Sequence, residues 1–320
     1  MKKLVTFILT LALFCVPMVA SASGAKKTIG VIQYVQHVAL DSAREGFVQA
    51  LADNGFVDGE GIVLDVQNAQ ADASNLATIS DRFVANNVDL VLAIATPAAQ
   101  SIAGKTTTIP ILGTAITDYV AARLVNSNEV PGTNVSGTTD MNPVADQIKL
   151  LKELFPDTKT VGVLYTSSED NSVLQAKMAK EAIEAEGMVY TEVTVTNSND
   201  VQQATQSIVE ECDAIYIPTD NVFASSMPVV YEVATAAKKP LIGGEAGMVQ
   251  AGGLATLGIN YYDLGYQTGL MAIRVLNGED ISKMPIETAT KMNYTFNSTY
   301  AEAIGYTIPE AYQAFAKPMN

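Results

Sequence analysis

The sequence has 320 residues, of which 19 are Lys or Arg and 34 are Asp or Glu, so its formal net charge is −15. A chain this acidic is a poor match for nucleic acid or an anionic membrane surface, and neither is expected as a partner. One histidine and two cysteines form no cluster at metal-ligand spacing, so neither a metal nor another cofactor is expected.

The first residues have the order of a secretory signal. Lys2-Lys3 precedes an apolar run at residues 4–19, and Ala20-Ser21-Ala22 forms a small-x-small cleavage site. A transmembrane helix needs about 20 apolar residues, whereas this run is shorter and contains a proline. The pattern predicts a signal peptide at residues 1–22, cleaved on export to the periplasm.

The two cysteines have different expected fates. A lipid anchor at Cys15 is not expected, because Phe14 stands where a lipoprotein signal has a small residue. Once the signal is removed, Cys212 has no partner for a disulfide within the chain. Cys212 begins an apolar segment, which favours a small core residue over a reactive thiol.

Apolar runs alternate with amphipathic stretches along the rest of the chain. The expected strands are residues 28–32, 62–66, 90–95, 110–115, 161–165, 189–195, 214–217 and 240–243. The expected helices are residues 39–54, 75–86, 144–154, 172–186, 201–211 and 222–238. Continuous Val, Ile and Leu runs indicate strands buried on both faces, which predicts doubly wound α/β architecture with parallel sheets covered by helices.

The plan occurs twice. Residues 28–32 (TIGVI) are echoed by residues 160–164 (TVGVL), and residues 110–113 (PILG) by residues 240–243 (PLIG). Between them, Asp89-Leu90-Val91 is echoed by Asp213-Ala214-Ile215 in the same order. Three echoes in one order predict two similar lobes.

Further elements follow the second copy, namely strands at residues 253–259 and 294–297 and a helix at residues 264–276. They predict a hinge of several strands, with crossings near residues 136–140, 258–261 and 283–287. We therefore expect residues 23–138 plus 259–284 to form lobe 1, and residues 139–258 plus 285–320 to form lobe 2. Ligands of open parallel sheets bind beyond the carboxyl ends of the strands, which here line an interlobe cleft.

The candidate residues of lobe 1 lie in three of these loops. Thr96-Pro97 favours a helix start, where the backbone N–H groups of Ala98 and Ala99 could bind a carboxylate. An ordinary capped turn explains the same residues without a ligand. Three candidates of the first loop could line a pocket for a flat side chain or play structural parts: Gln33, Tyr34 and His37. Asp118, which follows Thr117, could hold the ligand or cap the next segment.

The candidates of lobe 2 are mostly acidic or hydroxylated. Asp220 and Glu245 follow buried strands, and either carboxylate could bind an ammonium group. Asp220 could equally cap the next helix, whereas Glu is seldom a cap, which favours a ligand contact for Glu245. Four further candidates could bind a ligand or cap a helix: Ser167, Ser168, Asn171 and Asn221.

Catalysis is not expected. The sequence has no Gly-x-Ser-x-Gly elbow and no Gly-x-x-x-x-Gly-Lys phosphate loop, and His37 has no recognisable nucleophile partner. The pattern favours a binding protein over an enzyme.

Several stretches together resemble one family. These stretches are residues 30–37 with 39–41, 93–100, 137–143, 161–172, 215–221 and 243–248. In them the chain resembles the substrate-binding proteins of ABC importers for tryptophan, tyrosine or phenylalanine, which have the type I periplasmic-binding-protein fold. The resemblance implies a hinged, monomeric clamshell that binds an aromatic amino acid and docks on a membrane permease with its ATPase.

The resemblance also implies roles for individual residues. The ligand carboxylate would bind at Thr96, Ala98 and Ala99, and the ammonium group at Glu245, with Asp220 as the other candidate. The chain departs from the family pattern at Val38, Thr166 and Tyr119, beside the expected pocket. A sensory receptor subunit that presents its closed state to a membrane sensor is the alternative function.

Overall fold

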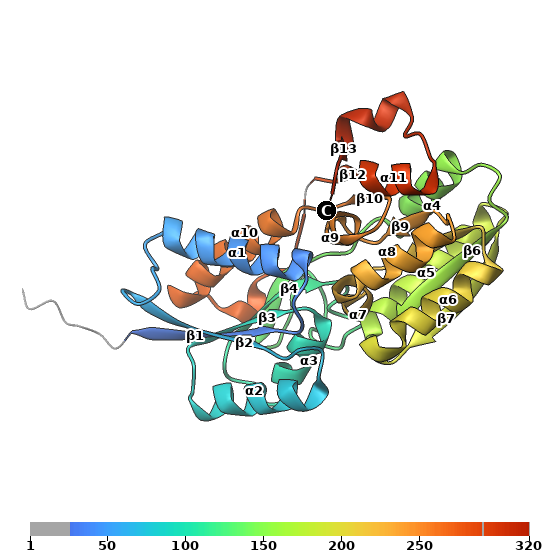
Figure 1. Ribbon diagram of the computed structural model, residues 1–320. Coiled ribbons are helices and arrows are strands. Elements are labelled where there is room, and N and C mark those ends of the chain that lie inside the picture. The colour runs from blue at the N-terminus through green and yellow to red at the C-terminus, as the bar shows by residue number, and fades with distance from the viewer. Residues whose placement is uncertain (1–25, 290, 320) are drawn as a thin grey trace, which may run out of the picture.

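The computed structural model describes residues 26–289 and 291–319, and it divides them between two sheets (Figure 1). The expected signal peptide and Cys15 lie outside the described residues. The first sheet is entirely parallel in the order β11-β5-β4-β3-β1-β2. Its strands are β1 (Lys27–Gln33), β2 (Ile62–Asn68), β3 (Leu90–Ile94), β4 (Ile111–Ile116), β5 (Val135–Thr139) and β11 (Glu287–Thr288).

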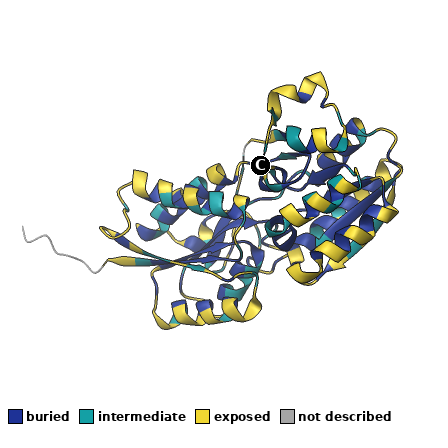
Figure 2. Ribbon diagram, in the orientation of Figure 1, coloured by how far each residue is buried: buried dark blue, intermediate teal, exposed yellow. Residues whose placement is uncertain are grey.

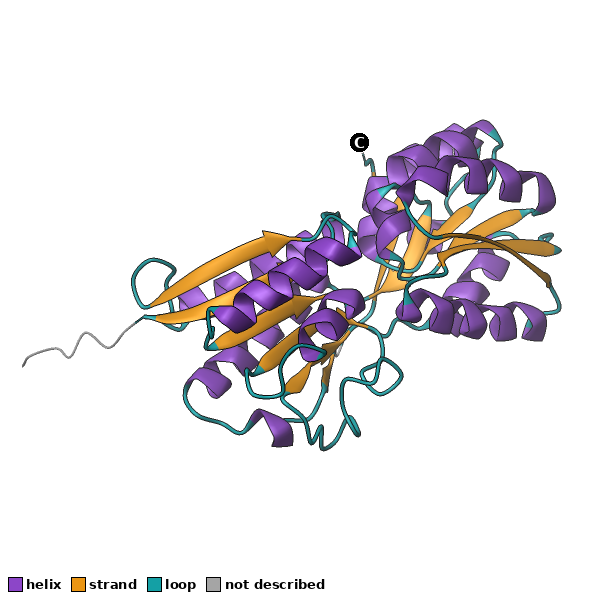
Figure 3. Ribbon diagram, turned by 90° about the horizontal axis from the view of Figure 1, so that it is seen from below, coloured by secondary structure: helices purple, strands orange, loops and turns teal. Residues whose placement is uncertain are grey.

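Helices cover both faces of this sheet, as the view from below shows (Figure 3). Helices α1 (Val38–Asp53) and α10 (Tyr261–Leu276) pack together on one face, and α2 (Ala73–Ala85) and α3 (Thr96–Ala103) pack together on the other. The layers explain why the strands lack polar alternation: β3 and β4 are buried at every position.

The second sheet has the order β13-β12-β10-β9-β8-β6-β7. Strand β12 is antiparallel to β10, and the other pairs are parallel. Its strands are β6 (Thr160–Thr166), β7 (Val189–Val195), β8 (Ala214–Ile217), β9 (Leu241–Gly243), β10 (Ala255–Gly258), β12 (Asn293–Asn297) and β13 (Ala316–Lys317). Its helices are α4 (Val144–Leu154), α5 (Asp170–Ala185), α6 (Val201–Glu211), α7 (Asn221–Ser225), α8 (Met227–Ala236), α9 (Ala246–Ala251) and α11 (Ser298–Ile304).

The two sheets repeat the same order, β2-β1-β3-β4-β5 in one and β7-β6-β8-β9-β10 in the other, which confirms the predicted α/β class with two lobes. The repeated sequence motifs occupy equivalent positions in the two lobes. The Asp89 carboxylate accepts the Thr28 N–H at 2.7 Å, and the Asp213 carboxylate accepts the Thr160 N–H at 2.9 Å. Each lobe has its own hydrophobic core, visible as the dark layers of Figure 2.

Each expected strand and helix is present within a few residues, except that residues 222–238 do not form one helix. They form α7 and α8, which are separated at Ser226. Pro228 lies in the first turn of α8, and proline inside a helix removes a hydrogen bond and clashes with the carbonyl four residues earlier. Cys212 is a free cysteine buried in the core of lobe 2, as predicted.

The chain crosses between the lobes at β5 to α4, at β10 to α10, and between β11 and β12. The last crossing comes later than expected. Glu287 of β11 pairs with Thr138, and Ile286 is buried in the core of lobe 1. Residues 285–288 therefore pack with lobe 1, which corrects the expected start of the lobe 2 segment at residue 285.

Glycines allow helix α10 to pack closely against α1. A Cβ atom on Gly265 would overlap the Ala43 carbonyl, and one on Gly46 would overlap the Tyr262 carbonyl. Such a close approach of two backbones requires glycine, because any other residue would push the helices apart. Over the described part of the chain, none of the helices is both long and apolar enough to cross a membrane.

Candidate functional site

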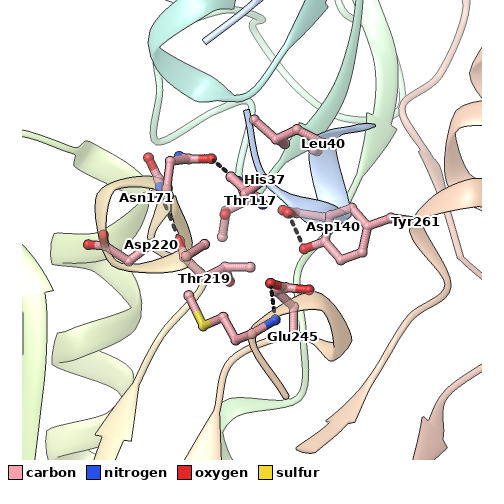
Figure 4. Close-up of a pocket in the computed structure, with 13 residues that line it drawn as sticks. His37, Leu40, Thr117, Asp140, Asn171, Thr219, Asp220, Glu245 and Tyr261 are labelled. Carbon is pink, nitrogen blue, oxygen red and sulfur yellow. Dashed lines mark hydrogen bonds between the residues drawn. The ribbon is translucent and has the colours of Figure 1, made fainter. Parts of the chain in front are cut away.

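The carboxyl ends of strands from both sheets meet around one cavity, which we call the central cavity (Figure 4). It is narrow, with a volume of about 10 Å³, because the two lobes are pressed together around it. The side chains that line it are His37, Leu40, Ala115, Thr117, Asp140, Asn171, Thr219, Asp220, Asn221, Ala224, Glu245, Met248 and Tyr261. No lysine or arginine is among these described lining residues.

Asp140 is placed in this cavity by the end of β5. Its Oδ2 accepts the Tyr261 hydroxyl at 2.7 Å, as Figure 4 shows. Its Oδ1 is buried and has no hydrogen-bond partner among the described residues. Burial raises the pKa of Asp140 to about 6, despite the hydrogen bond from Tyr261 and the nearby Thr117 hydroxyl, which both favour the ionised form.

Glu245 lies at the end of β9, where it caps helix α9. Its carboxylate accepts the N–H of Met248 at 2.7 Å and also the N–H of Gly247. Burial raises the pKa of Glu245 to about 7; the two N–H groups oppose this shift, and the charge of Asp140 adds to it. The effect of Asp140 on Glu245 indicates that the two carboxylates lie near each other, one after β5 of the first sheet and one after β9 of the second.

Asp220 is bound on all sides by its own lobe. Its carboxylate accepts the N–H and hydroxyl of Thr166, at 2.6 and 2.9 Å, and the N–H of Phe223 at 2.8 Å. The nearby Glu169 carboxylate accepts amide groups of Asn171 and Asn221. Burial, reinforced by Asp220, raises the pKa of Glu169 to about 8.

His37 joins the lobes across the cavity. Its Nε2 lies 3.2 Å from the Oδ1 of Asn221, while its Nδ1 is buried without a partner among the described residues. Burial lowers the pKa of His37 to about 4, and the contact with Asn221 only partly opposes this. The imidazole is therefore neutral near pH 7.

A second cavity of about 310 Å³ adjoins the first at Asn171, and we call it the rim cavity. It lies between the start of α3, the loop after β4 and helix α5. Thr96 lines it and has a buried Oγ1 without a partner among the described residues, as does the Oδ1 of Asn171. Ala95, which precedes α3, has a φ of 83°, a strained value of the kind found at functional sites.

The other predicted site residues lie elsewhere. Ala98 and Ala99 are in the core of lobe 1, and the Ala99 N–H already bonds to the Ala95 carbonyl at 3.2 Å. Gln33 bonds to Asp41 and Arg44 within lobe 1. Tyr34 is buried in lobe 1 but lies near the interface, because the charges of Glu169 and Asp220 add to burial in raising its pKa.

Three more predicted residues make local contacts. Asp118 borders the rim cavity, but its Oδ1 accepts the N–H groups of Val120 and Ala121, both at 2.9 Å. The hydroxyls of Ser167 and Ser168 bond to the carbonyls of Val195 and Thr196 and do not line the central cavity.

Among the acidic and aromatic residues at the site, Asp140, Glu169 and Tyr261 were not predicted. Asp140 lies in a stretch that resembles the family, but no role was predicted for it. Asp140 and Tyr261 also lie in segments interpreted as hinge crossings, although each follows a strand at its carboxyl end. That position, the same one that singled out Asp220 and Glu245, was the available signal for Asp140. Glu169 lies within the loop of Ser167 and Ser168, where nothing local distinguished its buried side chain.

Two further contacts join the lobes outside the central cavity. The Gln100 side chain of α3 donates to the Asp170 carboxylate of α5 at 2.8 Å. At Gly247 of α9, an added Cβ would lie 2.9 Å from the Ala39 nitrogen of α1. The described structure therefore has its lobes in direct contact on both sides of the central cavity.

Two doubly wound lobes with several crossings and a cavity between them define the type I periplasmic-binding-protein fold. Within that class, a family model described as ABC transporter substrate binding protein matches residues 28–319. The chain belongs to this family, whose members are extracytoplasmic substrate-binding proteins of ABC transporters, and the resemblance seen in the sequence is confirmed.

Individual relatives are similar over most of the chain. A tyrosine-binding protein of Clostridioides difficile is 41% identical over 282 residues, which are 88% of this chain and 82% of the relative. A Streptococcus pneumoniae structure in complex with L-Trp is 38% identical, with a TM-score of 0.88, and covers 92% of this chain and 100% of its own.

A third relative is informative about the lobes. The ligand-free, open structure of a Clostridium difficile substrate-binding protein with adhesive properties is 45% identical over 92% of this chain and 100% of its own. Its TM-score is nevertheless only 0.70, below that of the less identical complex with L-Trp. Together with the contacts across the cavity, this identifies the arrangement described here as a closed one.

Proposed function

We propose that this protein binds an aromatic amino acid between its lobes and presents it to an ABC permease. The observation that carries the proposal is the buried Asp140 carboxylate, with one unpartnered oxygen, opposite Glu245 in a cavity lined by no lysine or arginine. A buried carboxylate without a cation is unfavourable, and an organic ammonium group would supply both charge and hydrogen bonds.

The α-ammonium group binds between Asp140 and Glu245. Asp220 is the weaker candidate for this role, because backbone and hydroxyl donors of lobe 2 already occupy its oxygens. Within the described ranges, these acids do not belong to a His, Cys, Asp and Glu group that could hold a metal ion. This favours an organic cation over an inorganic one.

The α-carboxylate binds toward Thr96 and Asn171. The Thr96 hydroxyl is unpartnered among the described residues and can donate to the carboxylate. The Asn171 amide already donates to Glu169 and to the Thr219 carbonyl, so Asn171 would contribute through the backbone at the start of α5. Both residues lie at helix N-termini, α3 and α5, where the helix dipole favours negative charge. Ala98 and Ala99 would contribute only through the backbone at the start of α3.

The aromatic side chain is proposed from the relatives, one named a tyrosine-binding protein and one solved with L-Trp. The predicted signal sequence at residues 1–22 fits export to the periplasm without a lipid anchor at Cys15. There the protein acts as a monomer that docks, when closed, on a permease with its ATPase and releases the ligand unchanged.

Isothermal titration calorimetry on residues 23–320 tests the proposal with the twenty amino acids and the corresponding amines. We expect selective binding of tyrosine, tryptophan or phenylalanine. Glu245→Gln should weaken that binding about 10- to 100-fold, since a charge-assisted hydrogen bond contributes about 1.5–3 kcal/mol. Glu232→Gln, on an exposed part of α8, is the matched control.

Two results would count against the proposal. Tight binding of a ligand without an amino group would remove the assigned role of the carboxylates. Unchanged affinity in Glu245→Gln would remove Glu245 from the site and leave the ammonium group to Asp140 alone.

A further inference from the structure

We propose that the rim cavity is the subsite for the aromatic ring, and that Arg123 and Lys177 recognise the ring face as cations. This inference rests on the proposed function, because it assumes an amino-acid ligand whose ammonium group lies between Asp140 and Glu245. It assigns the side-chain selectivity of the protein to two residues that the sequence did not single out.

The rim cavity has the size and walls that a ring requires. At about 310 Å³ it falls at the lower end of the range of about 300–1,000 Å³ for small-molecule pockets, whereas the central cavity holds about 10 Å³. Its walls include the aliphatic side chains of Ala122, Val173 and Leu174. A flat hydrocarbon face can pack on these side chains, and the narrow, polar central cavity cannot accommodate it.

The central cavity and the rim cavity share Asn171, and two residues of the rim cavity have buried oxygens without a hydrogen-bond partner among the described residues. Asn171 lines both cavities and is 5% exposed, and Thr96 lines the rim cavity and is 3% exposed. Each has a buried oxygen without a hydrogen-bond partner among the described residues. A ligand whose carboxylate accepts from the Thr96 hydroxyl and whose ammonium group donates to the Asn171 Oδ1 would direct its side chain into the rim cavity.

The two cations approach the rim cavity from different lobes. Arg123 belongs to the loop after β4, and Lys177 to helix α5. Neither forms an ion pair or a side-chain hydrogen bond with any other residue that the structure describes. The two acids at this cavity have other partners: Asp118 accepts two backbone N–H groups, and Asp170 accepts Gln100.

Unpaired cations beside an aliphatic cavity suit an aromatic ring, because the ring face carries negative charge density. The ligand carboxylate would also attract them, but a carboxylate needs neither this volume nor aliphatic walls. A third cavity, of about 210 Å³ on the hinge side of Glu245, is lined by Ser42, Gln250 and other polar side chains and offers no cation. It therefore fits a ring less well.

The test compares two ligands that differ only in aromaticity. Binding of L-phenylalanine and L-cyclohexylalanine to residues 23–320 is measured by calorimetry for the wild type, Arg123→Met, Lys177→Met and the double variant. In the Met variants, we expect the affinity for phenylalanine to fall about 3- to 30-fold and the affinity for cyclohexylalanine to fall by less than about 2-fold. Arg123→Lys should retain most of the affinity for phenylalanine.

Controls separate this result from other effects. Lys180→Met removes the same charge from α5 outside the rim cavity and should leave both affinities unchanged. Gln250→Ala alters the hinge-side cavity and should likewise have no effect. Melting temperatures of all variants verify that they are folded, as expected for substitutions of exposed residues.

Three outcomes overturn the inference in distinguishable ways. Equal weakening of both ligands would assign the cations to the carboxylate. Unchanged binding of both, or a loss only in Gln250→Ala, would place the ring elsewhere while leaving the proposed function intact. A wild-type protein that binds no aromatic amino acid at all would overturn the proposed function together with the inference.

Discussion

The buried side chain of Asp140, when ionised, does not stabilise the ligand-free fold. Its side chain is 4% exposed, one oxygen has no partner among the described residues, and its pKa is raised to about 6 by burial. An ionised group in this position destabilises the ligand-free protein. The same property makes it a strong site for an ammonium group, because the ligand supplies what the protein lacks.

Asp140→Asn should therefore change stability and binding in opposite directions. The amide oxygen can still accept the Tyr261 hydroxyl, while the buried charge is removed, so the ligand-free melting temperature should rise at pH 8. Affinity for the amino acid should fall about 10-fold or more. Thermal unfolding and calorimetry measure the two effects.

Asp146→Asn is the control, because Asp146 is exposed and pairs only with Lys149 on the surface. A lower melting temperature for Asp140→Asn would show that the ionised side chain stabilises the fold, contrary to the argument above.

Single residues of the site could be located from the sequence only where a buried strand ended in a recognisable loop. Glu245 and Asp220 follow runs of Ile, Leu or Tyr, whereas Asp140 follows the strand Val-Ser-Gly-Thr-Thr, which has no apolar run. The direction of a side chain was not predictable: Ser167 and Asn171 lie in one expected loop, yet only Asn171, which begins α5, reaches the cavity. Direction is set by backbone dihedrals that local composition does not specify.

At the scale of elements, α3 and α5 are joined by the Gln100–Asp170 hydrogen bond, which links the lobes without lining the central cavity. A contact of this kind exists only when the lobes are closed. It therefore favours the closed state and raises the apparent ligand affinity through the closed population.

Gln100→Ala should lower ligand affinity about 2- to 10-fold, the effect of losing its hydrogen bond across the lobes, of about 0.5–1.5 kcal/mol. The weaker bond of the same amide to the Ala122 carbonyl, at 3.3 Å, lies within lobe 1 and does not depend on closure. The melting temperature without ligand should hardly change, since the open form lacks the contact. Gln49→Ala, which removes a bond to Asp53 within α1, is the control for a surface glutamine. An affinity equal to that of the wild type would show that this contact does not contribute to closure.

Most strands and helices were predictable because doubly wound sheets bury their strands on both faces and leave long apolar runs. Predictions failed where tertiary packing decides. The short strand β11 has no apolar pattern of its own and belongs to lobe 1 because Glu287 pairs with Thr138. The helix break at Ser226 was also missed. Pro228 lies in the first turn of α8, and the sequence alone did not show that a new helix begins there.

For the whole molecule, the closed arrangement should depend on pH through the carboxylates of the central cavity. Their pKa values are raised, to about 6 for Asp140 and about 7 for Glu245. The protonated carboxyl groups therefore stabilise the ligand-free fold at low pH, and this contribution is lost as the pH rises through these two pKa values. An ammonium ligand favours the ionised forms and lowers both pKa values. Binding below about pH 7 must therefore release protons.

Ligand affinity should consequently rise about 10-fold or more between pH 5 and pH 8 and then level off. Calorimetry at four pH values in buffers of different ionisation enthalpy measures both the affinity and the released protons. His37 should not contribute, because its pKa of about 4 leaves it neutral over this range. A flat profile would mean that the ligand does not meet ionised carboxylates.

The late position of α10 in the chain has a consequence for how the molecule comes into being. Lobe 1 begins at β1 but is completed by α10 and β11, and lobe 2 is completed by β12 and β13. As a nascent chain emerges N-terminus first, the groove of α1 at Gly46 stays uncovered until Gly265 has been synthesised. Residues 261–317 thus complete both lobes almost together, so that for most of its synthesis the chain has no finished lobe to fold.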